Sequence, residues 1–552
     1  MTHIEKNKTF YIISAIFGVY ILLSVPHLVN ENPWAPDADR ISMDGVFILD
    51  FIRDMPGSLV NIYDYTIEYY AKYPALSIGY RPAFFPLVEA FFYYIFGLHH
   101  ISAKMAVFLF LFAGMLFWFL LVREIYDIPT ALLSLLLWLT NPVVYQYSQQ
   151  TMLEIPTLSM CIVCVYYLYI YEKAPSVSYG IILGTVVGLT LWTNQKSGFI
   201  LFLLLIYPFV KKNSKLLFAR NTWISAGIIL AFLIPLICIT LWLGDQNLEQ
   251  SVGTRPEGKS WFSSLRLFKN IYFLYHYHFS FLVLAMAFAG MVFSFIRRDS
   301  ECLIFVVVIL CVYLFFTIIR VKISRYPMYW IPFFCIFAAI GFQKLIWHLE
   351  QFLKTGSSFI KYAICAFPVI LQLCFLPNVF VGYAGGYEEA AKYVLKKTAS
   401  PVIFFEGYAN GQFIFFARKH DTDRQFVILR GDKILSSSSI SHKNKLKIHL
   451  HDREEIYKAL SDFSVHFVVV ESADISNIKI YRELRNLLRD TSLFKLHKTI
   501  QVESNNGSLK NQNLLVYENL GYKKDLVKDQ ILNLRLPIVG KTIKVKLKKI
   551  LR

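Results

Sequence analysis

The chain has 552 residues, of which 56% are hydrophobic and 16% are aromatic. Soluble domains are only about 45–50% apolar, so this composition argues against a soluble globular protein. The net charge of +18 would suit a nucleic-acid partner, but in a membrane protein excess Lys and Arg usually set topology and contact headgroups. We therefore discount nucleic-acid binding. All eight cysteines lie within or at the ends of apolar runs, which argues against a disulfide framework or a Cys-based zinc site in the polar regions.

Apolar segments long enough to cross a membrane, about 17–25 residues, recur from the N-terminus to residue 380. The first, 9–29, is too long for the apolar region of a typical signal peptide and has no A-x-A-like site after it. We read it as a retained signal anchor. The sequence thus predicts a polytopic α-helical membrane domain over 1–380 with about eleven transmembrane helices. The ten further spans are expected at roughly 101–122, 128–146, 155–171, 176–194, 197–210, 221–243, 281–296, 302–319, 326–346 and 359–380.

The segment PAFFPLVEAFFYYIFG, residues 82–97, is ambiguous. It is shorter than about 17 residues and contains Glu89 and two prolines, so we expect a helix that lies in, or dips into, the membrane interface. The basic loops, 211–220 among them, then face the cytoplasm as the positive-inside rule requires. In a plasma or inner membrane this topology places the N-terminus in the cytoplasm. The loop at about 30–100 and everything after residue 380 are then extracytoplasmic.

The segment RVKISRYP, residues 320–327, does not follow this charge pattern. It joins two predicted spans, and the topology places Arg320, Lys322 and Arg325 on the outer side, where basic loops are not expected. An anion bound at the outer membrane surface would explain these cations. Contact with lipid phosphates alone is the alternative.

From about residue 385 the composition becomes that of a soluble domain, in which helical and strand patterns alternate. Such alternation predicts an extracytoplasmic α/β domain over 385–520. The remaining 521–552 is a basic tail that either lies on anionic lipid or is a frayed, solvated end. We expect helices at 388–397, 452–463 and 475–490, and strands at 401–407, 413–418, 425–429, 466–472 and 513–519.

Acidic residues and cations gather on the expected outer side. Asp44 follows two other aspartates near the start of the outer loop, in the segment 41–57, whose apolar spacing predicts a helix along the membrane surface. Glu154 lies at the outer end of a span. An acid that removes a proton from an attacking hydroxyl, together with cations that stabilise charge on phosphate oxygens, suits displacement of a phosphate leaving group. The cations at outer ends of spans or in outer loops are Arg81, Lys196, Arg320, Lys322 and Arg325.

Each of these residues also has a structural interpretation. Asp44 suits the negative charge favoured near the N-terminus of a surface helix. Glu154 precedes Ile155-Pro156 and suits a helix cap, and Lys196 suits a side chain that snorkels to the interface. Their shared side of the membrane, rather than any one residue, favours a site.

The order of segments resembles a known family. An N-terminal span and a large outer loop are followed by YPALSIGYRPAFFPLVEAFFYYIFG and then by ALLSLLLWLTNPVVYQYSQQTMLEIPTLSM, in which MLEIPT is the most specific element. This pattern resembles the GT-C glycosyltransferases of glycosyltransferase family 39, the protein O-mannosyltransferase and aminoarabinose-transferase type. The resemblance is good for about 1–210, weaker to residue 346, and poor in the C-terminal domain.

The resemblance implies an inverting glycosyltransferase that moves a sugar from a polyprenyl-phosphate carrier to an acceptor hydroxyl outside the cytoplasm. Asp44 matches the family's general base, and Glu154 matches an acid that positions the acceptor or, in some relatives, a metal. Arg81 aligns with a basic residue before the family's proline pair, and Arg325 would bind the carrier phosphate, with Lys196 a weaker match for the same role. Many relatives have Asp-Glu where this chain has Asp44-Gly45. We therefore expect no obligatory metal or other cofactor, with Asp44 and Glu154 the possible ligands of a divalent cation.

Two other functions remain open. A transporter or flippase of lipid-linked or anionic solutes would use similar spans, although few ionisable groups lie deep in them and no inverted repeat of broken helices is evident. The second alternative is a non-catalytic assembly protein that binds cell-wall glycan. On the enzyme reading, the partners are the lipid-linked donor, membrane lipids and an acceptor that could be a protein, a lipid or a polysaccharide.

Overall fold

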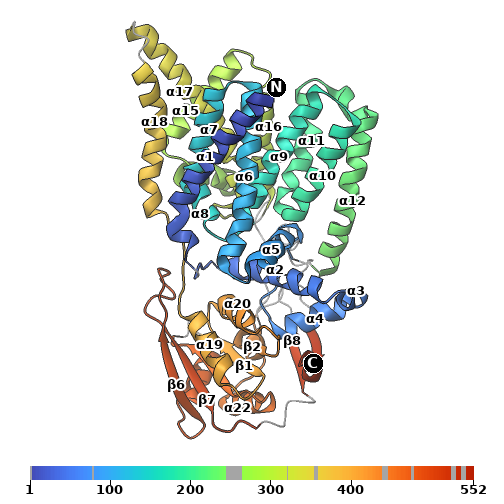
Figure 1. Ribbon diagram of the computed structural model, residues 1–552, viewed down its shortest axis with the longest axis vertical. Coiled ribbons are helices and arrows are strands. Elements are labelled where there is room, and N and C mark those ends of the chain that lie inside the picture. Colours follow the sequence, from blue (N-terminus) through green and yellow to red (C-terminus); the bar gives the residue numbers. More distant parts are fainter. Residues whose placement is uncertain are drawn as a thin grey trace.

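The computed structural model is a helical bundle with a C-terminal α/β domain at one end and the chain's N-terminus at the other (Figure 1). The helices of the loop at about 30–100 lie between the bundle and this domain (Figure 1). The structure describes residues 3–30, 32–35, 37–77, 80–243, 264–319, 321–353, 358–437, 446–473, 478–523, 530–535 and 542–551.

A helix stands at every predicted span. Among the described residues, six helices are long and apolar enough to cross a membrane, and the bent pair α7–α8 makes a seventh. Shorter apolar helices occupy the remaining predicted spans, so length and composition alone support fewer crossings than predicted. The bundle helices are α1 (His3–Leu28), α6 (His100–Ile125), α7 (Ile128–Leu139), α8 (Pro142–Ser148), α9 (Glu154–Lys173), α10 (Val177–Thr193), α11 (Phe199–Val210), α12 (Arg220–Leu243), α15 (Phe281–Ile296), α16 (Leu303–Ile318), α17 (Ile331–Leu353) and α18 (Ser358–Phe375), with α14 (Ser264–Phe273) beside them.

The predicted span at 128–146 is broken by a bend of 65° between α7 and α8. Pro142 begins α8, and proline has no backbone N–H to continue the helical ladder. The side-chain oxygen of Asn141 instead accepts hydrogen bonds from the backbone of Val143 at 3.0 Å and Val144 at 3.4 Å. Asn-Pro therefore ends one helix and caps the next.

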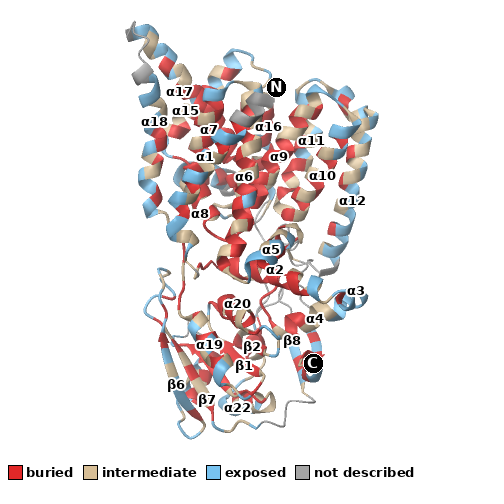
Figure 2. Ribbon diagram, viewed as in Figure 1, coloured by how far each residue is buried: buried red, intermediate tan, exposed pale blue. Residues whose placement is uncertain are grey.

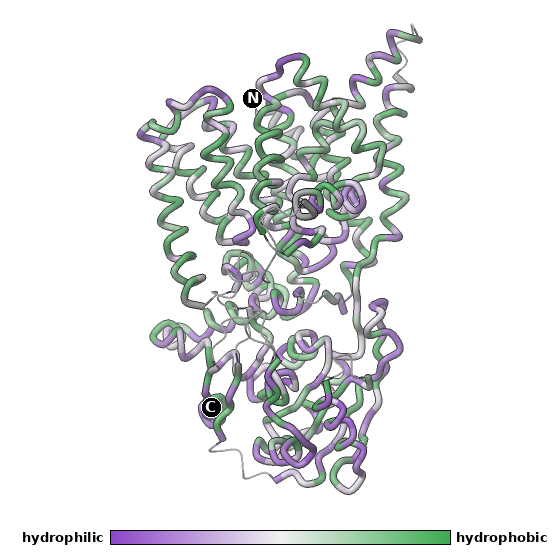
Figure 3. The backbone as a smooth tube through the Cα atoms, turned by 180° about the vertical axis from the view of Figure 1, so that it is seen from behind, coloured by the Kyte–Doolittle hydropathy of each residue, from purple (hydrophilic) through white to green (hydrophobic). Residues whose placement is uncertain are grey.

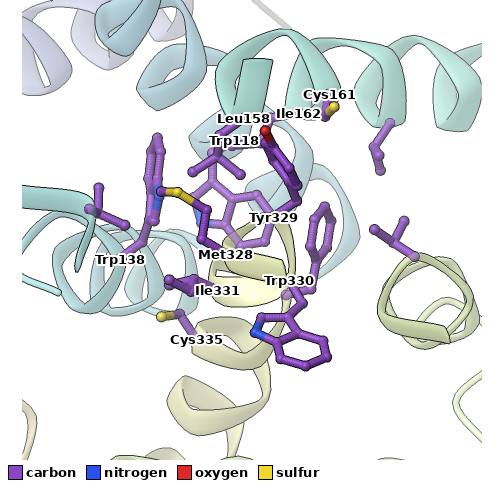
Figure 4. Close-up of a cluster of buried hydrophobic side chains, with 14 of the residues drawn as sticks. Trp118, Trp138, Leu158, Cys161, Ile162, Met328, Tyr329, Trp330, Ile331 and Cys335 are labelled. Carbon is purple, nitrogen blue, oxygen red and sulfur yellow. The ribbon is translucent and has the colours of Figure 1, made fainter. Parts of the chain in front are cut away.

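Aromatic side chains fill the centre of the bundle, where the 3₁₀ turn η4 (Tyr326–Trp330) leads into α17. Figure 4 shows Trp118 and Trp138 gathered with Tyr329 and Trp330 of this turn, and all four are buried. The Trp330 indole N–H donates to His278 Nδ1 at 2.8 Å. Because η4 is locked into this core, the backbone directly before it is held in place. The outward faces of α12 and α18 are largely exposed (Figure 2) and, in a membrane protein, suit contact with lipid.

The outer loop contributes α2 (Ala38–Arg53), α3 (Gly57–Val60), α4 (Ile62–Lys72) and α5 (Phe84–Phe96). The ambiguous 82–97 segment is a short helix, as predicted, and it packs against α2. The helix predicted at 41–57 is present in α2, which packs against α5 and against α20 (Asn410–His420) of the C-terminal domain. Its place along the membrane surface stays a prediction. Met43, Val46 and Leu49 of α2 belong to one hydrophobic core with the apolar residues of that domain.

The C-terminal domain is built on a five-stranded sheet in the order β2-β1-β5-β7-β6. The strands β1 (Val402–Glu406), β2 (Val427–Arg430) and β5 (Phe467–Glu471) are parallel, and their near-continuous apolar sequences suit strands covered on both faces. The other two, β6 (Phe494–Gln501) and β7 (Asn513–Asn519), are antiparallel. The helices of the domain are α19 (Tyr387–Lys397), α20, α21 (Gly431–Ile434), α22 (Arg453–Asp462) and α23 (Lys479–Leu488), with the small strands β3 (Ser436–Ser437) and β4 (Lys447–Ile448).

Two expectations for this domain need correction. Residues 413–418, which the sequence predicts as a strand, belong to the helix α20. The prediction is wrong because a short apolar run fits a buried helix as well as it fits a buried strand. The described parts of the basic tail are not a frayed end: β8 (Ile531–Arg535) pairs with β9 (Thr542–Lys546) and packs against α21, while β9 and α24 (Leu547–Ile550) pack against α4. Alternate side chains of this hairpin are apolar and buried, which a sum of charges over the tail does not reveal.

Candidate active site

Three charged side chains from distant parts of the chain meet at the end of the bundle that faces the C-terminal domain. Arg81 Nη2 lies 3.0 Å from Asp37 Oδ1, and Arg325 Nη2 lies 2.8 Å from Asp37 Oδ2. One carboxylate thus bridges two guanidinium groups. Burial alone would raise the pKa of Asp37, but the charges of Arg81 and Arg325 outweigh it and lower that pKa, so the carboxylate stays ionised at neutral pH.

A second carboxylate extends the cluster. Glu154 Oε1 lies 3.5 Å from Arg325 Nε and 3.6 Å from Lys196 Nζ. The Lys196 ammonium also lies 4.1 Å from the ring centroid of Tyr326, a cation–π contact. Of the predicted site residues, Arg81, Glu154, Lys196 and Arg325 therefore lie in one network, joined through Asp37.

Local structure explains these positions. Glu154 is the first residue of α9, where a negative charge is favoured, and Pro156 fits the first turn. Lys196 lies in the 3₁₀ turn η1 (Gln195–Gly198), which the Asn194 side chain caps by accepting the Lys196 backbone N–H at 3.1 Å. Arg325 directly precedes η4, so the aromatic core described above fixes its backbone.

Asp44 lies apart from this network but close to it. Its side chain is buried, and Oδ1 accepts the Ser77 backbone N–H at 2.7 Å. Burial raises the pKa of Asp44 to about 7, against the opposing charge of Arg81. A carboxyl with a pKa in this range is partly ionised at neutral pH and can take up or release a proton there.

Asp44 and Arg81 line the same cavity, which has a volume of about 240 Å³. The remaining walls are mostly apolar and come from α2, α4, the start of α5, α10 and α12. Figure 3 shows that the bundle beside this end is predominantly hydrophobic, whereas polar residues gather on the C-terminal domain. The cavity thus joins a carboxyl and a guanidinium to an apolar surface. Its other lining residues are Phe47, Ile48, Phe51, Ile62, Thr66, Pro82, Ala83, Pro86, Trp192, Gln195, Leu236 and Ile239.

Sequence reasoning missed two acids of the site. Asp37 was noted only as one of several aspartates, and Glu89 only as a reason against a membrane span. Glu89 is fully buried, and neither carboxylate oxygen has a hydrogen-bond partner in the structure. Burial, and then the nearby Asp44, raises the pKa of Glu89 well above its ordinary value. A Cβ on Gly45 would lie 2.7 Å from Glu89 Cβ, so glycine after Asp44 allows this close approach of α2 and α5. The sequence signal for Glu89 is a single acidic residue inside an otherwise apolar helix.

Lys322, a second cation of RVKISRYP, has different partners from Arg325. Lys322 donates to the backbone carbonyls of Phe316 and Thr317, where it caps the C-terminal end of α16. Arg320 lies outside the described residues. The predicted phosphate-binding role of these two residues stays a prediction, and the geometry gives Lys322 a structural role.

The two possible metal ligands have different partners. Asp44 accepts the Ser77 N–H, whereas Glu154 faces Lys196 and Arg325. A divalent cation at Glu154 would meet two positive charges, so this surrounding fits the group poorly. Within the described ranges, no group of three or more His, Cys, Asp or Glu side chains is arranged to hold a metal ion. That catalysis needs no metal stays a prediction.

Comparison with known proteins supports the fold. Residues 80–242 match the family model described as dolichyl-phosphate-mannose-protein mannosyltransferase. No curated protein matches the chain by sequence. ArnT from Cupriavidus metallidurans in the apo state has a TM-score of 0.61 at 13% identity, over 91% of this chain and 97% of that one. The same protein bound to undecaprenyl phosphate gives 0.56 at 12% identity, again over 91% and 97%.

A third solved structure, the Archaeoglobus fulgidus oligosaccharyltransferase in the apo form, has a TM-score of 0.53 at 12% identity, over 83% of this chain and 69% of that one. At such identities the likeness concerns the fold rather than the activity. The structural matches, the family match and the apolar helices agree with one another: the chain has the fold of the polytopic GT-C glycosyltransferases, with a C-terminal domain.

Proposed function

We propose that the protein is an integral-membrane inverting glycosyltransferase that moves a sugar from a polyprenyl-phosphate carrier to an acceptor hydroxyl. The observation that carries this proposal is that Arg81 belongs both to the cavity and to the charged network. It lines the cavity that holds Asp44, and it joins Arg325 through Asp37. A group able to accept a proton and a set of cations able to hold a phosphate are thereby adjacent.

In this mechanism Asp44 is the general base. It takes the proton from the acceptor hydroxyl as that oxygen attacks the anomeric carbon, and the bond from this carbon to the carrier phosphate breaks on the opposite face. The leaving phosphate gains negative charge, which Arg81, Arg325 and Lys196 stabilise. Arginine suits this role because its planar fork of N–H donors matches phosphate oxygens. A base with a pKa near the working pH is favourable for such a transfer.

The apolar part of the cavity suits the prenyl chain of the carrier. Trp192 of α10 and Leu236 and Ile239 of α12 form one wall, and most of α12 is not covered by other helices. A lipid could therefore reach the cavity from the bilayer between these elements. ArnT from Cupriavidus metallidurans, which shares the fold, has been solved with undecaprenyl phosphate bound.

The orientation in the membrane is part of the proposal. The site and the C-terminal domain lie at the same end of the bundle, opposite to the N-terminus (Figure 1). With the positive-inside rule this end is extracytoplasmic, in a plasma or inner membrane. The acceptor, whether protein, lipid or polysaccharide, would then approach from outside the cell or from the periplasm.

The test compares binding and transfer in purified protein. We expect Arg325→Ala to lose at least about tenfold in affinity for undecaprenyl phosphate at fixed salt, because it loses a charged contact. Lys322→Gln is the matched control, since it removes one charge from the same segment at a side chain that donates to the backbone carbonyls of Phe316 and Thr317. In a carrier-dependent transfer assay, Asp44→Asn should lose about 10²–10⁴-fold in turnover, the usual contribution of a positioned base. Intact transfer in folded Asp44→Asn would exclude Asp44 as the base. Carrier binding without any transfer by the wild type would favour a transporter.

A further inference from the structure

The carbonyl directly before Arg325 is held from inside the bundle. Ser324 precedes Arg325, and its backbone oxygen lies 2.8 Å from Nε2 of His278, a residue 46 positions earlier in the chain. His278 is buried, with an exposed fraction of 1%. A buried ring therefore contacts the backbone from which Arg325 extends, at a distance typical of a hydrogen bond.

The partners of His278 define the state of its ring. A carbonyl oxygen only accepts, so Nε2 donates its N–H to Ser324. An indole N–H only donates, so Nδ1 accepts the bond from Trp330 at 2.8 Å. The two bonds together require the neutral ring with its proton on Nε2. Nε2 thus holds the turn before Arg325, and Nδ1 contacts the aromatic core that follows it.

Local structure fixes His278 itself. It ends the π-helical turn η3 (Leu274–His278), and such turns are rare and often lie at functional sites. The His278 carbonyl accepts a hydrogen bond from Asn141 Nδ2 at 2.6 Å. Asn141 also caps α8 after the bend, so the break between α7 and α8 is joined to η3 at His278. The residue is consequently held at its backbone as well as at its ring.

Arg325 needs such support because the chain before it is irregular. Residues 321–323 belong to no helix or strand. The Arg325 side chain is 17% exposed, and its contact with Glu154 is long, at 3.5 Å. Arginine has a long and flexible side chain, so a fixed backbone reduces the conformational freedom that is lost when the guanidinium binds an anion. The Ser324 carbonyl is a point at which this segment is attached to the bundle.

We propose that His278 is a positioning residue for the carrier phosphate: by holding the Ser324 carbonyl, it fixes the backbone from which Arg325 reaches that phosphate. The inference rests on the proposed function, because it takes the phosphate as a ligand of Arg325. In this role His278 touches neither the phosphate nor the sugar. It acts through Arg325, and its effect disappears when that arginine is absent.

The alternative role of His278 is to pack the aromatic core through Trp330. The two roles depend on different ring nitrogens, and amide side chains can separate them. The Gln amide nitrogen corresponds in position to Nε2 of histidine, so His278→Gln keeps a donor for Ser324. The Asn amide group corresponds to Nδ1, so His278→Asn keeps an acceptor for Trp330 but loses the donor.

The experiment measures the affinity of the purified protein for undecaprenyl phosphate, with undecaprenol as the probe that lacks the phosphate. We expect His278→Asn to bind undecaprenyl phosphate about tenfold more weakly than the wild type, an effect of the size of one hydrogen bond. His278→Gln should stay within about threefold of the wild type. Undecaprenol binding should not change in either variant.

The controls separate positioning from folding. His276→Asn is the matched control, because it is the same substitution in the same turn at an exposed ring, and it should leave binding unchanged. His278→Asn and His278→Gln each lose one bond of the ring, so their melting temperatures should be similar. Trp330→Phe removes the other partner of the ring but keeps an aromatic side chain, and it should retain phosphate binding within about threefold.

A double-mutant cycle with Arg325 provides a second readout. In the Arg325→Ala protein, adding His278→Asn should cause no further loss of phosphate affinity, because the arginine through which His278 acts is already absent. A purely structural role would weaken binding equally in both backgrounds.

The outcomes separate this inference from the proposed function. Equal losses in His278→Asn and His278→Gln, or a loss of about tenfold in Trp330→Phe, overturn it, because the core would then carry the effect. A further loss in the Arg325→Ala background also overturns it. If Arg325→Ala loses phosphate binding while no His278 variant does, the positioning role falls and the proposed function stands. If the wild type binds undecaprenyl phosphate no better than undecaprenol, the proposed function falls, and the role of His278 falls with it.

Discussion

Two charge networks lie at opposite ends of α2, and they are built differently. At the C-terminal end, Arg418 of α20 holds Asp50 by two bonds, Nε to Oδ2 at 2.9 Å and Nη2 to Oδ1 at 2.6 Å. Tyr69 also donates to Asp50, at 2.6 Å. Both partners of the ion pair are almost fully buried, with exposed fractions of 4% and 1%.

At the N-terminal end, the network of Arg81, Lys196, Arg325, Asp37 and Glu154 has three cations for two carboxylates. Its contacts around Glu154 are long, 3.5 and 3.6 Å. Glu154 is buried, but the other four members are partly exposed. A buried, saturated one-to-one pair holds two domains together. A partly exposed network with a positive charge to spare, beside a cavity, is suited to bind an anion. We therefore propose that the same helix carries a structural network at one end and a ligand-binding one at the other, and the following predictions test this division.

The largest effect is expected at the structural end. Arg418→Met leaves Asp50 buried without its cation, and breaking a buried pair in this way costs about 3–5 kcal/mol. The measurement is the free energy of unfolding of the C-terminal domain and α2, followed by denaturant titration in detergent. The double variant Arg418→Met, Asp50→Leu is the control and should recover much of the loss. A loss below about 1 kcal/mol, the value typical of exposed pairs, would mean that the Arg418–Asp50 pair stabilises the fold no more than an exposed ion pair does.

The second prediction concerns the pH dependence at the ligand-binding end. The pKa of Asp44 is raised to about 7 by burial, and a general base acts only when it is deprotonated. Activity should therefore be full above pH 7 and fall about tenfold for each pH unit below it, as for a single ionisation. The measurement is kcat/KM for transfer between pH 5 and 9. An activity that stays level down to pH 5 would contradict the role of Asp44, since that residue would then be largely protonated.

The smallest effect is expected at a third ion pair, which lies beside the structural network. Arg424 contacts Asp54 with Nη1 at 2.5 Å and Nη2 at 2.7 Å, and the two side chains are 30% and 28% exposed. Solvent screening reduces such pairs to about 0–1 kcal/mol, so Arg424→Met should barely change the free energy of unfolding. A loss as large as that of Arg418→Met would mean that bidentate geometry, rather than burial, decides the strength of this interface.

The sequence predicted the parts of the molecule that depend on local pattern. Apolar length located a helix at every predicted span, and the alternation of elements indicated the α/β domain. The charge argument brought Arg81, Glu154, Lys196 and Arg325 to one side of the membrane, and the structure brings these four together. The sequence also predicts Asp44 as a site residue, and Asp44 lines the same cavity as Arg81.

What the sequence could not reveal depends on contacts between distant residues. Arg325 and Asp37 are 288 positions apart, so nothing local indicates that one carboxylate bridges the two arginines. Lys322 looks like Arg325 in the sequence, and only the direction of its side chain, toward the end of α16, separates them. The sequence predicts a strand at 413–418, where the structure has a helix, because six mostly apolar residues fit a buried strand and a buried helix equally well.

The fold also sets the order in which this protein can mature. Arg418 is 368 positions from Asp50, and the carbonyl of Ile550, which accepts a hydrogen bond from Lys72 at 2.9 Å, is 478 positions from its partner. During synthesis, α2 and α4 therefore leave the ribosome long before the residues that cover them. We expect the nascent chain to carry an uncovered outer loop throughout insertion of the later bundle helices. Docking of the C-terminal domain and tail onto α2 and α4 would then be one of the last events in biogenesis, after the bundle helices have been inserted.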